Sequence, residues 1–495
     1  MVMKHYKLAG LLFVLLVFSG CKKFEDFQQN PNNPTIADPS LLLPTVERIA
    51  FSTISVDAAL ASRYLAYTQS ASDAQYYGWQ RNSMNYGSIT QVIKMEQEAA
   101  RTGKTNYRYI AKFLKAYFIV NMTQVFGDIP YSQMMQSITN NNFTDSSATR
   151  PVYDKQLDVY LGVLDELKIA NDSLSADQVS IGGDLIYDGD IQKWKKLINS
   201  FTLRVLMSLS KKESEASLNI KQRFNEIVSN PSQYPIFESN ADNGQLSYHN
   251  ITDNEYPYFN NNSMKTDFYL DSSFVDILQE LKDPRLFVFG KPMPSSSLPE
   301  NNFNAYDGLV GSAPLDYNTA KRGAGKASQI NDRYAYEAIN EPSVLMSYAE
   351  VQFLLAEAAV RGWIADDASV FYKKGIEASL TFSNFNNTYS SADIQNYLNE
   401  PEVELQPGSE IEQVITQKYI SMFMNTGWMP FYEQRRTGFP VFDVSGSGIL
   451  NGGLIPKRWM YPSDEYVNNA ANVESAVNRQ YPGGDNINGV MWILE

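Results

Sequence analysis

The feature that most limits how this chain can fold is the spacing of its apolar residues, which recur every three or four positions along several stretches. In residues 107–130, for example, Ile110, Phe113 and Tyr117 follow that spacing. A repeat near 3.6 residues places apolar side chains on one face of an α-helix. The same spacing predicts further helices within residues 154–170, 189–212, 343–363, 366–380 and 409–424.

Short breaks separate several of these predicted helices, which indicates pairs of packed neighbours. Gly362 interrupts the chain between two of them, and glycine commonly ends a helix. Small residues such as Ala358 and Ala359 on the expected contact face allow close approach. We therefore expect a mostly α fold of tetratricopeptide-like helix pairs, with long irregular loop inserts and a few short β-hairpins, although the consensus of that repeat is not clean.

Residues 231–340 differ in composition from the helical stretches. They are rich in Asn, Pro, Ser, Tyr and Gly and contain few long periodic runs. Long irregular segments of a compact protein are commonly functional, and the aromatic residues in this one indicate order. Since no low-complexity linker divides the chain, we expect a single domain over residues 36–495, with ligand-face inserts mainly in 231–340.

The first residues have the parts of an export signal. Two lysines precede an apolar run over residues 8–18, which is too short to span a bilayer but has the length of a signal peptide. Small residues then precede Cys21, the only cysteine in the chain. This pattern predicts a lipoprotein signal peptide over residues 1–20, a lipid anchor on Cys21 and a polar tether over residues 21–35. The alternative is an ordinary secretory signal that ends in a chance cysteine.

Charge and histidine content exclude several functions. The net charge of −14 opposes nucleic-acid binding, which needs clustered Lys and Arg. His5 falls in the signal peptide and leaves His249 alone, so neither a histidine-rich zinc centre nor a Ser-His-Asp triad is expected. A loop and a helix N-cap explain Asp184, Asp188 and Asp190 more simply than a calcium site does. We expect no cofactor, no metal and no catalytic residue, although counting cannot exclude the acid pair of a glycoside hydrolase.

Four motifs follow one another along the chain. They are DLIYDGDIQKWKKLINSFTLRVLMSLS at 184–210, MSYAEVQFLLAEAAVRGW at 346–363, FYEQRRTGFP at 431–440 and RWMYPSDEYVNNAANVESAV at 458–477. Together they resemble the SusD/RagB-like outer-membrane lipoproteins of Bacteroidota, and NPNNPT after Cys21 also fits. The run WMPFY departs from the Trp-aromatic-acidic run that is commoner in this family. We expect this departure to affect packing more than function.

The resemblance covers nearly the whole chain and implies an α-rich fold without catalysis. It also implies a lipid-anchored protein of the outer membrane that faces the cell exterior. Its partner would be a SusC-like TonB-dependent transporter, and its cargo glycan or peptide fragments. The family carries its ligand sites on variable loops, so no binding residue transfers by motif. We interpret five motif residues as fold residues: Trp194, Trp363, Trp428, Arg435 and Arg436.

Candidate ligand residues therefore come from chemistry. Sugars present flat C–H faces that suit aromatic rings, and hydroxyl pairs that suit amides and carboxylates. The stretches 73–88 and 253–264 combine rings with Asn, and Gly78 and Gly87 indicate a loop in which rings would be exposed. The alternative is that the rings cover the helical core. The candidates are Tyr76, Tyr77, Trp79, Tyr86, Tyr256, Tyr258, Phe259, Asn260 and, in a third stretch, Tyr306.

These observations favour a cell-surface lipoprotein that binds oligosaccharides and passes them to a transporter. One alternative is the same architecture with peptide cargo. A second is a surface glycoside hydrolase, which binding without turnover would exclude. A third is a helical-repeat scaffold without a small ligand, in which substitution of Trp79 or Tyr258 changes stability alone.

Overall fold

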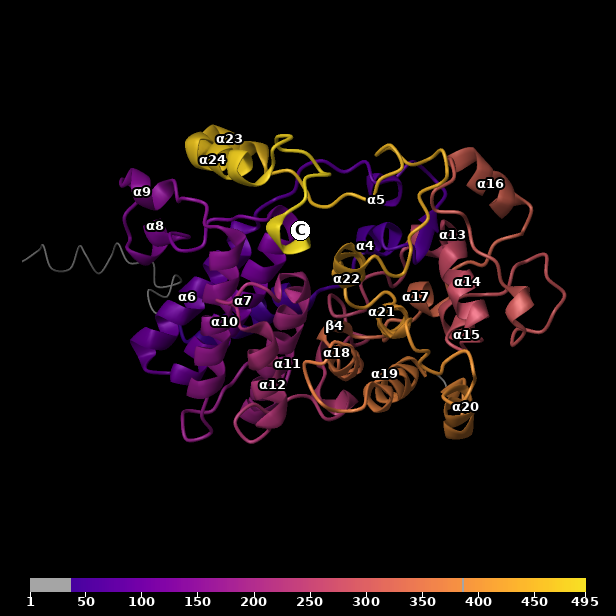
Figure 1. The fold of residues 1–495 in the computed structure, drawn as a ribbon, viewed down its shortest axis with the longest axis horizontal. Coiled ribbons are helices and arrows are strands. Elements are labelled where there is room, and N and C mark those ends of the chain that lie inside the picture. Colours follow the sequence, from indigo (N-terminus) through magenta and orange to yellow (C-terminus); the bar gives the residue numbers. More distant parts are fainter. Residues whose placement is uncertain (1–36, 385–386) are drawn as a thin grey trace, which may run out of the picture.

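The structure, a computed structural model, describes residues 37–384 and 387–495 (Figure 1). The predicted signal peptide, the anchor on Cys21 and the tether over 21–35 lie outside these residues. Within them helices predominate and the strands are few and short, which confirms the mostly α fold class. None of the described helices is both long enough and apolar enough to cross a membrane.

The helices of the N-terminal half pack as neighbours. α6 (Tyr86–Thr102) packs against α7 (Thr105–Phe126), and α7 packs against α10 (Gln156–Ser173). Gly127 ends α7 with a φ of +88°, a conformation that few L side chains adopt. The other helices of this half are α3 (Pro39–Phe51), α4 (Val56–Ala61), α5 (Asp73–Tyr76), α8 (Gln136–Thr139), α9 (Ser146–Thr149), α12 (Ile220–Ser229) and the short η1 (Ser210–Lys212).

Helix α11 (Ile191–Ser208) begins where the sequence predicts. The Asp190 side chain caps its first turn by accepting two backbone N–H groups. Trp194 is fully buried, 6.0 Å from the Phe113 ring, and its indole N–H donates to Asp184 Oδ2 at 2.7 Å. Asp184 also accepts three backbone N–H groups of the loop that follows it. The interpretations of Asp190 as a cap and Asp184 as a loop residue are both confirmed.

The C-terminal half is built around α18 (Tyr348–Val360), which packs against α19 (Ala368–Ser383) and α21 (Glu410–Ser421). The stretch predicted as one helix over 343–363 begins instead with a buried strand, β4 (Ser343–Met346). The remaining helices are α20 (Ser391–Tyr397), α22 (Met429–Thr437), α23 (Ser463–Asn468), α24 (Ala470–Gln480) and the short η5 (Trp492–Leu494).

Within residues 37–384 and 387–495, four short strands form two antiparallel pairs. β1 (Leu65–Tyr67) pairs with β3 (Phe268–Leu270), and β2 (Gly244–Leu246) pairs with β4. Each pair joins strands far apart in the sequence, so neither is a β-hairpin, and that part of the prediction is wrong. The strands hold the irregular segment against the two helical halves rather than turning back on themselves. That segment also contains α13 (Asn262–Thr266), α14 (Ser272–Glu280), α15 (Leu286–Phe289), α16 (Leu315–Gly323), α17 (Arg333–Tyr336), η2 (Asn240–Asp242) and η3 (Phe303–Ala305).

The last part of the chain returns to the N-terminal half, where α23 and α24 lie near α8 and α9 (Figure 1). The Tyr153 hydroxyl donates to Glu465 Oε2 at 2.6 Å, and the Asn469 amide donates to the Pro151 carbonyl at 2.8 Å. These contacts join segments that are far apart in the sequence. The segment between α22 and α23 therefore crosses from one half of the molecule to the other.

A buried network of ion pairs joins helices of both halves. Arg204 of α11 binds Glu350 of α18 through two bonds, Nε–Oε1 at 2.7 Å and Nη2–Oε2 at 2.5 Å. Arg436 of α22 binds Glu357 of α18 in the same bidentate way, at 2.6 and 2.7 Å. The network consists of three buried cations and three buried carboxylates: Arg204, Lys418, Arg436, Glu350, Glu357 and Glu433.

We predict that Glu357→Gln lowers the free energy of unfolding by about 3–5 kcal/mol, because it leaves the buried Arg436 with half of its counter-charge. Burial raises the pKa of Glu357, but the guanidiniums of Arg436 and Arg361 together outweigh burial and hold that pKa below its usual value, so the wild-type group is ionised. Denaturant unfolding measures the difference. The control is Glu474→Gln at an exposed position of α24, with an expected change within about 0.5 kcal/mol. Equal stability of the two variants would contradict the prediction.

Glu47 of α3 is a buried acid that, unlike the carboxylates of the network, forms no ion pair with a described residue. Its side chain is fully buried, and its Oε2 accepts the backbone N–H of Leu185 at 2.8 Å. Burial, together with the neighbouring Asp184 carboxylate, raises the pKa of Glu47 to about 10. The folded protein therefore keeps this carboxyl protonated at neutral pH, whereas the unfolded chain ionises it above its ordinary pKa of 4.5.

Because only the unfolded chain releases this proton, the wild-type protein loses stability as pH rises from about 4.5 toward 10. Glu47→Gln carries no such proton and keeps an oxygen to accept the Leu185 N–H. We predict that the Tm of this variant, relative to the wild type, increases steadily with pH. Thermal unfolding of both proteins at several pH values between about 4.5 and 8 tests this. A difference in Tm that is independent of pH would show that Glu47 does not hold the proton.

Candidate functional site

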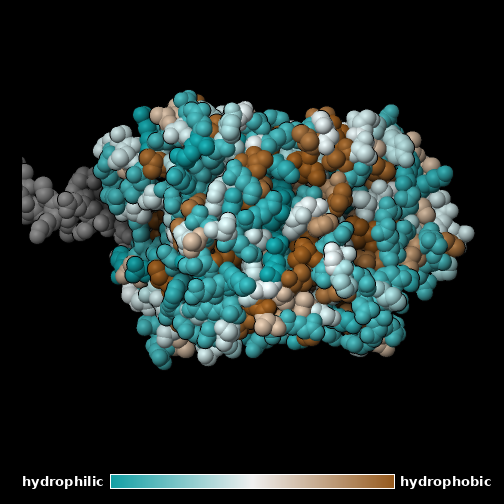
Figure 2. Space-filling view, in the orientation of Figure 1, coloured by the Kyte–Doolittle hydropathy of each residue, from teal (hydrophilic) through white to brown (hydrophobic). Residues whose placement is uncertain are grey.

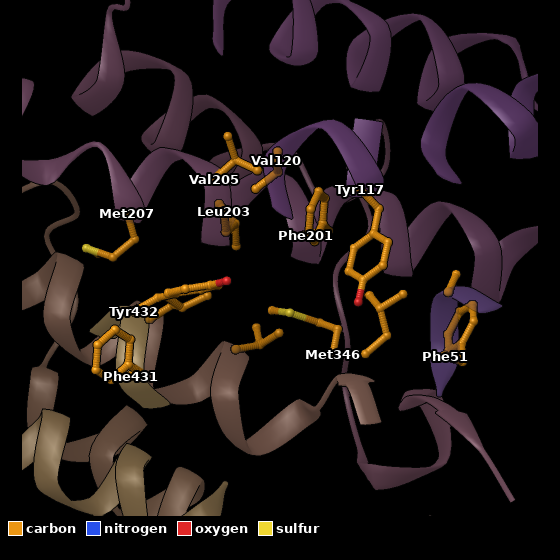
Figure 3. Close-up of a cluster of buried hydrophobic side chains, with 14 of the residues drawn as sticks. Phe51, Tyr117, Val120, Phe201, Leu203, Val205, Met207, Met346, Phe431 and Tyr432 are labelled. Atoms are coloured by element: carbon orange, nitrogen blue, oxygen red, sulfur yellow. The ribbon is translucent and has the colours of Figure 1, made fainter. Parts of the chain in front are cut away.

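A cavity of about 450 Å³ lies between the N-terminal helices α3 and α7 and the segment that leads into α22. Tyr117 and Tyr432 both line it, and Figure 3 shows the hydroxyl ends of both rings turned toward the space between the helix layers. Tyr117 comes from α7 and Tyr432 from α22. The volume falls within the range of about 300–1,000 Å³ that small-molecule sites occupy.

The loops at this cavity have local sequence causes. Gly427 has a φ of +62°, and a Cβ there would lie 2.5 Å from the Thr53 carbonyl oxygen, so glycine lets the loop before α22 approach the end of α3. The Thr53 hydroxyl in turn donates to the Asn425 carbonyl at 2.7 Å. The loop before α6 ends at Asn85, whose φ of +51° lies in the left-handed region that asparagine tolerates.

The cavity combines aromatic surface with hydrogen-bonding groups. Aromatic faces suit the apolar faces of a sugar, whereas hydroxyls and amides suit its polar edge. The rings belong to Tyr117, Phe118, Phe126, Trp428 and Tyr432. The hydroxyls and amides belong to Ser52, Thr53, Ser55, Asn82, Ser83, Asn85, Asn121 and Thr426.

The cavity is electrostatically neutral. Among the residues that the structure describes, Arg204 is the one Asp, Glu, Lys, Arg or His side chain that lines it, and Glu350 balances its charge. Burial raises the pKa of Tyr432 to about 12 and also raises the pKa of Tyr117. Both hydroxyls therefore stay protonated at neutral pH. The site is suited to an uncharged ligand that makes many hydrogen bonds.

The structure places most rings of the first predicted cluster in the core. Tyr76, Tyr77 and Trp79 are buried, and Trp79 stacks on Trp459 with ring centroids 4.8 Å apart. Their expected exposure is wrong, because rings from distant parts of the sequence cover them. Tyr86 is half-buried in the first turn of α6 and does not line the cavity.

Sequence reasoning missed the residues of this stretch that do line the cavity, which are the polar neighbours between Gln80 and α6. Asn82 and Asn85 are both exposed there. Trp428, assigned from its motif to the fold, also lines the cavity and packs edge-to-face against Trp79 at 5.7 Å. The available signals were the run Asn-Ser-Met-Asn before a helix and the glycine before Trp428, both of which mark turns.

Two other candidate rings lie in the core. Tyr256 is buried against Tyr248, with ring centroids 5.6 Å apart. Tyr306 is buried and donates its hydroxyl to the Glu300 carbonyl at 2.8 Å. Other parts of the irregular segment and the helices cover these two candidate rings.

The other three candidates of the second cluster keep accessible surface. Tyr258 and Phe259 are half-buried, and Asn260 is exposed. The Tyr258 hydroxyl accepts the backbone N–H of Val56 at 3.0 Å, and the preceding residue, Ser55, lines the cavity. This hydrogen bond connects the second predicted cluster to the wall of the cavity.

Other cavities present charged walls. One of about 370 Å³ between α14 and α21 is lined by Asp276, Glu280 and Glu412. Another of about 260 Å³ among α10, α11 and α12 is lined by side chains of both signs. Within residues 37–384 and 387–495, no group of three or more His, Cys, Asp or Glu is arranged to hold a metal ion.

Comparison with known proteins gives consistent matches. The SusD-like family model described as "starch-binding associating with outer membrane" matches residues 31–462. A SusD homologue from Bacteroides fragilis is 38% identical, with a TM-score of 0.84, and the match covers 93% of this chain and 99% of that chain. An outer-membrane protein of Bacteroides vulgatus named for nutrient binding is 36% identical, with a TM-score of 0.85, and the match covers 93% and 100%.

A chitin-binding protein is 26% identical, with a TM-score of 0.73, and the match covers 92% of this chain and 100% of that chain. No curated protein matches the sequence. The family match extends over far more than half of the chain, and the resemblance carried by the four motifs is confirmed. The chain thus belongs to the SusD-like family of outer-membrane nutrient-binding proteins.

Proposed function

We propose that this protein is a lipid-anchored outer-membrane protein that captures oligosaccharides at the cell surface without catalysis. They bind in the cavity between α7 and α22 and pass to a SusC-like TonB-dependent transporter. The observation that carries the proposal is the chemistry of the cavity, in which several aromatic rings lie beside hydroxyls and amides and the single charge is neutralised. Membership of a starch-binding family and likeness to a chitin-binding protein support a glycan as the ligand.

Three residues predicted from the sequence extend the proposed site. Tyr258 contacts the loop beside the cavity, and the neighbouring Phe259 and Asn260 offer a ring and an amide to a longer ligand. The cavity-lining residues themselves lie outside 231–340. The prediction that this segment carries the main ligand face therefore stays a prediction, supported at Tyr258.

Two alternative functions fit the cavity less well. Glycoside hydrolysis needs a pair of carboxylates, and no Asp or Glu among the described residues lines the cavity. A short peptide would bring charged termini, but the one cationic side chain in the wall is already paired with Glu350. An uncharged oligosaccharide needs neither group.

An exposed apolar surface supports docking to a partner. Figure 2 shows hydrophobic residues over the centre and upper right of one face, where the segment between α22 and α23 runs in Figure 1. Val441, Leu450 and Leu454 of that segment are 75%, 63% and 55% exposed. Exposed apolar surface commonly marks an interaction site. In this proposal the surface contacts the transporter.

We predict that a screen of oligosaccharides and peptides by calorimetry, with the full-length protein in detergent, finds binding to a carbohydrate class without turnover. Trp428→Ala should weaken that binding roughly three- to tenfold, because it removes a ring that lines the cavity. Phe143→Ala is the matched control, since that ring is 63% exposed on a loop elsewhere.

Thermal unfolding of each variant separates lost binding from lost stability. Equal affinity of Trp428→Ala and Phe143→Ala for the bound sugar would place the site outside this cavity. Binding of peptides alone would replace the oligosaccharide proposal with peptide capture. Release of shorter sugars would make the protein an enzyme.

The anchor has its own test. Cys21→Ser removes the thiol that the sequence pattern assigns to acylation, so the variant should move from the detergent phase to the aqueous phase in a phase-partition experiment. Mass spectrometry of the wild-type protein should show acyl chains on its first peptide. Identical partitioning of both proteins would point instead to an ordinary secretory signal.

A further inference from the structure

A small niche adjoins the cavity. It has a volume of about 20 Å³ and shares Asn121, Arg204, Met429 and Tyr432 with the cavity. That space holds about one group of the size of a water molecule. Polar residues such as Gln124 also line it. A ligand in the cavity can therefore place a small polar group in the niche.

Arg204 has one nitrogen that the fold does not use. Its Nε and Nη2 bind Glu350, and Nη2 also donates to the Leu345 carbonyl at 2.7 Å. The third nitrogen, Nη1, donates to no residue within the described ranges, although the side chain is only 4% exposed. Since Arg204 lines both the cavity and the niche, this donor is available to a ligand. An acceptor of a ligand that reaches Nη1 gains a hydrogen bond to a charged donor, and such bonds are stronger than those between neutral groups.

The Tyr432 hydroxyl is a second donor at the same place. It makes no hydrogen bond to another described residue, and the side chain is 8% exposed. Figure 3 shows the hydroxyl end of this ring turned toward the space between the helix layers. Because burial raises the pKa of Tyr432 to about 12, the hydroxyl keeps its proton.

Two donors beside apolar walls match a particular chemical group. A carbonyl oxygen has two lone pairs and accepts from both donors. Met122, Val125 and Met429 offer apolar surface to a methyl group attached to that carbonyl. A plain sugar hydroxyl brings no methyl, and a carboxylate would add charge beside a network whose charges already cancel.

We propose that Arg204 and Tyr432 form an acyl-recognition subsite, which selects oligosaccharides that carry N-acetyl groups. The inference rests on the proposed function and narrows it to one class of sugar. The amide carbonyl accepts from Arg204 Nη1 and the Tyr432 hydroxyl, and the acetyl methyl packs against the apolar wall. The sugar ring itself stays in the larger cavity, beside Trp428 and the polar loops.

The test compares three trimers of equal length by calorimetry on the full-length protein in detergent: N-acetylglucosamine, glucosamine and glucose. The N-acetylated trimer should bind at least roughly tenfold more tightly than the other two, as expected for two hydrogen bonds and a buried methyl. Tyr432→Phe removes one donor and keeps the ring, so it should weaken binding of the N-acetylated trimer roughly three- to tenfold. The variant should therefore lower the ratio between the affinities for the N-acetylated trimer and for the glucose trimer. Tyr317→Phe, at an exposed ring on α16, is the matched control.

Arg204→Lys keeps the charge but loses the bidentate bonding to Glu350, so it is expected to destabilise the fold, and Tyr432→Phe decides the outcome. If the three trimers bind with equal affinity, or if Tyr432→Phe leaves the preference unchanged, the acyl subsite is refuted while oligosaccharide capture stands. If none of these sugars nor any other oligosaccharide binds, the proposed function fails and the subsite fails with it. The two failures are therefore distinguishable.

Discussion

The packing of α11, α18, α21 and α22 depends on one set of buried ion pairs. A guanidinium that binds a carboxylate through two parallel bonds fixes direction as well as distance. Arg204 and Arg436 both bind α18 in this way, at Glu350 and Glu357, so that helix is held from two sides. Buried charges are costly unless all are paired. The helices therefore gain this stabilisation only when they pack together, which makes their association cooperative.

The same network determines the character of the cavity. Arg204 takes part in both, with two nitrogens in the fold and one left for a ligand. Because Glu350 cancels its charge, the cavity can hold a polar donor without attracting anions strongly. A structural ion pair thus produces a neutral, hydrogen-bonding surface, which suits uncharged oligosaccharides better than nucleotides or acidic peptides.

Helix positions were predictable because apolar period is a local property of sequence, and α7, α10, α11 and α19 lie where it places them. The exposure of rings was not, since Trp79 is covered by Trp428 and Trp459, far along the chain. The prediction of β-hairpins failed for the same reason, because the two strands of each pair come from distant segments. The proposed contact between Arg204 and a ligand was not predictable either. A helical motif does not show which of the three guanidinium nitrogens will form hydrogen bonds within the protein.

The walls of the cavity come from parts of the chain near both of its ends, with Ser52 on one side and Trp428 on the other. A chain that ends before Gly427 has one of these walls and lacks the other. Under the proposed function such a chain cannot hold sugar, because the ligand would meet only half of its site. Loss of the chain from Gly427 onward, through early termination or a protease, would then remove binding entirely instead of leaving a weaker receptor.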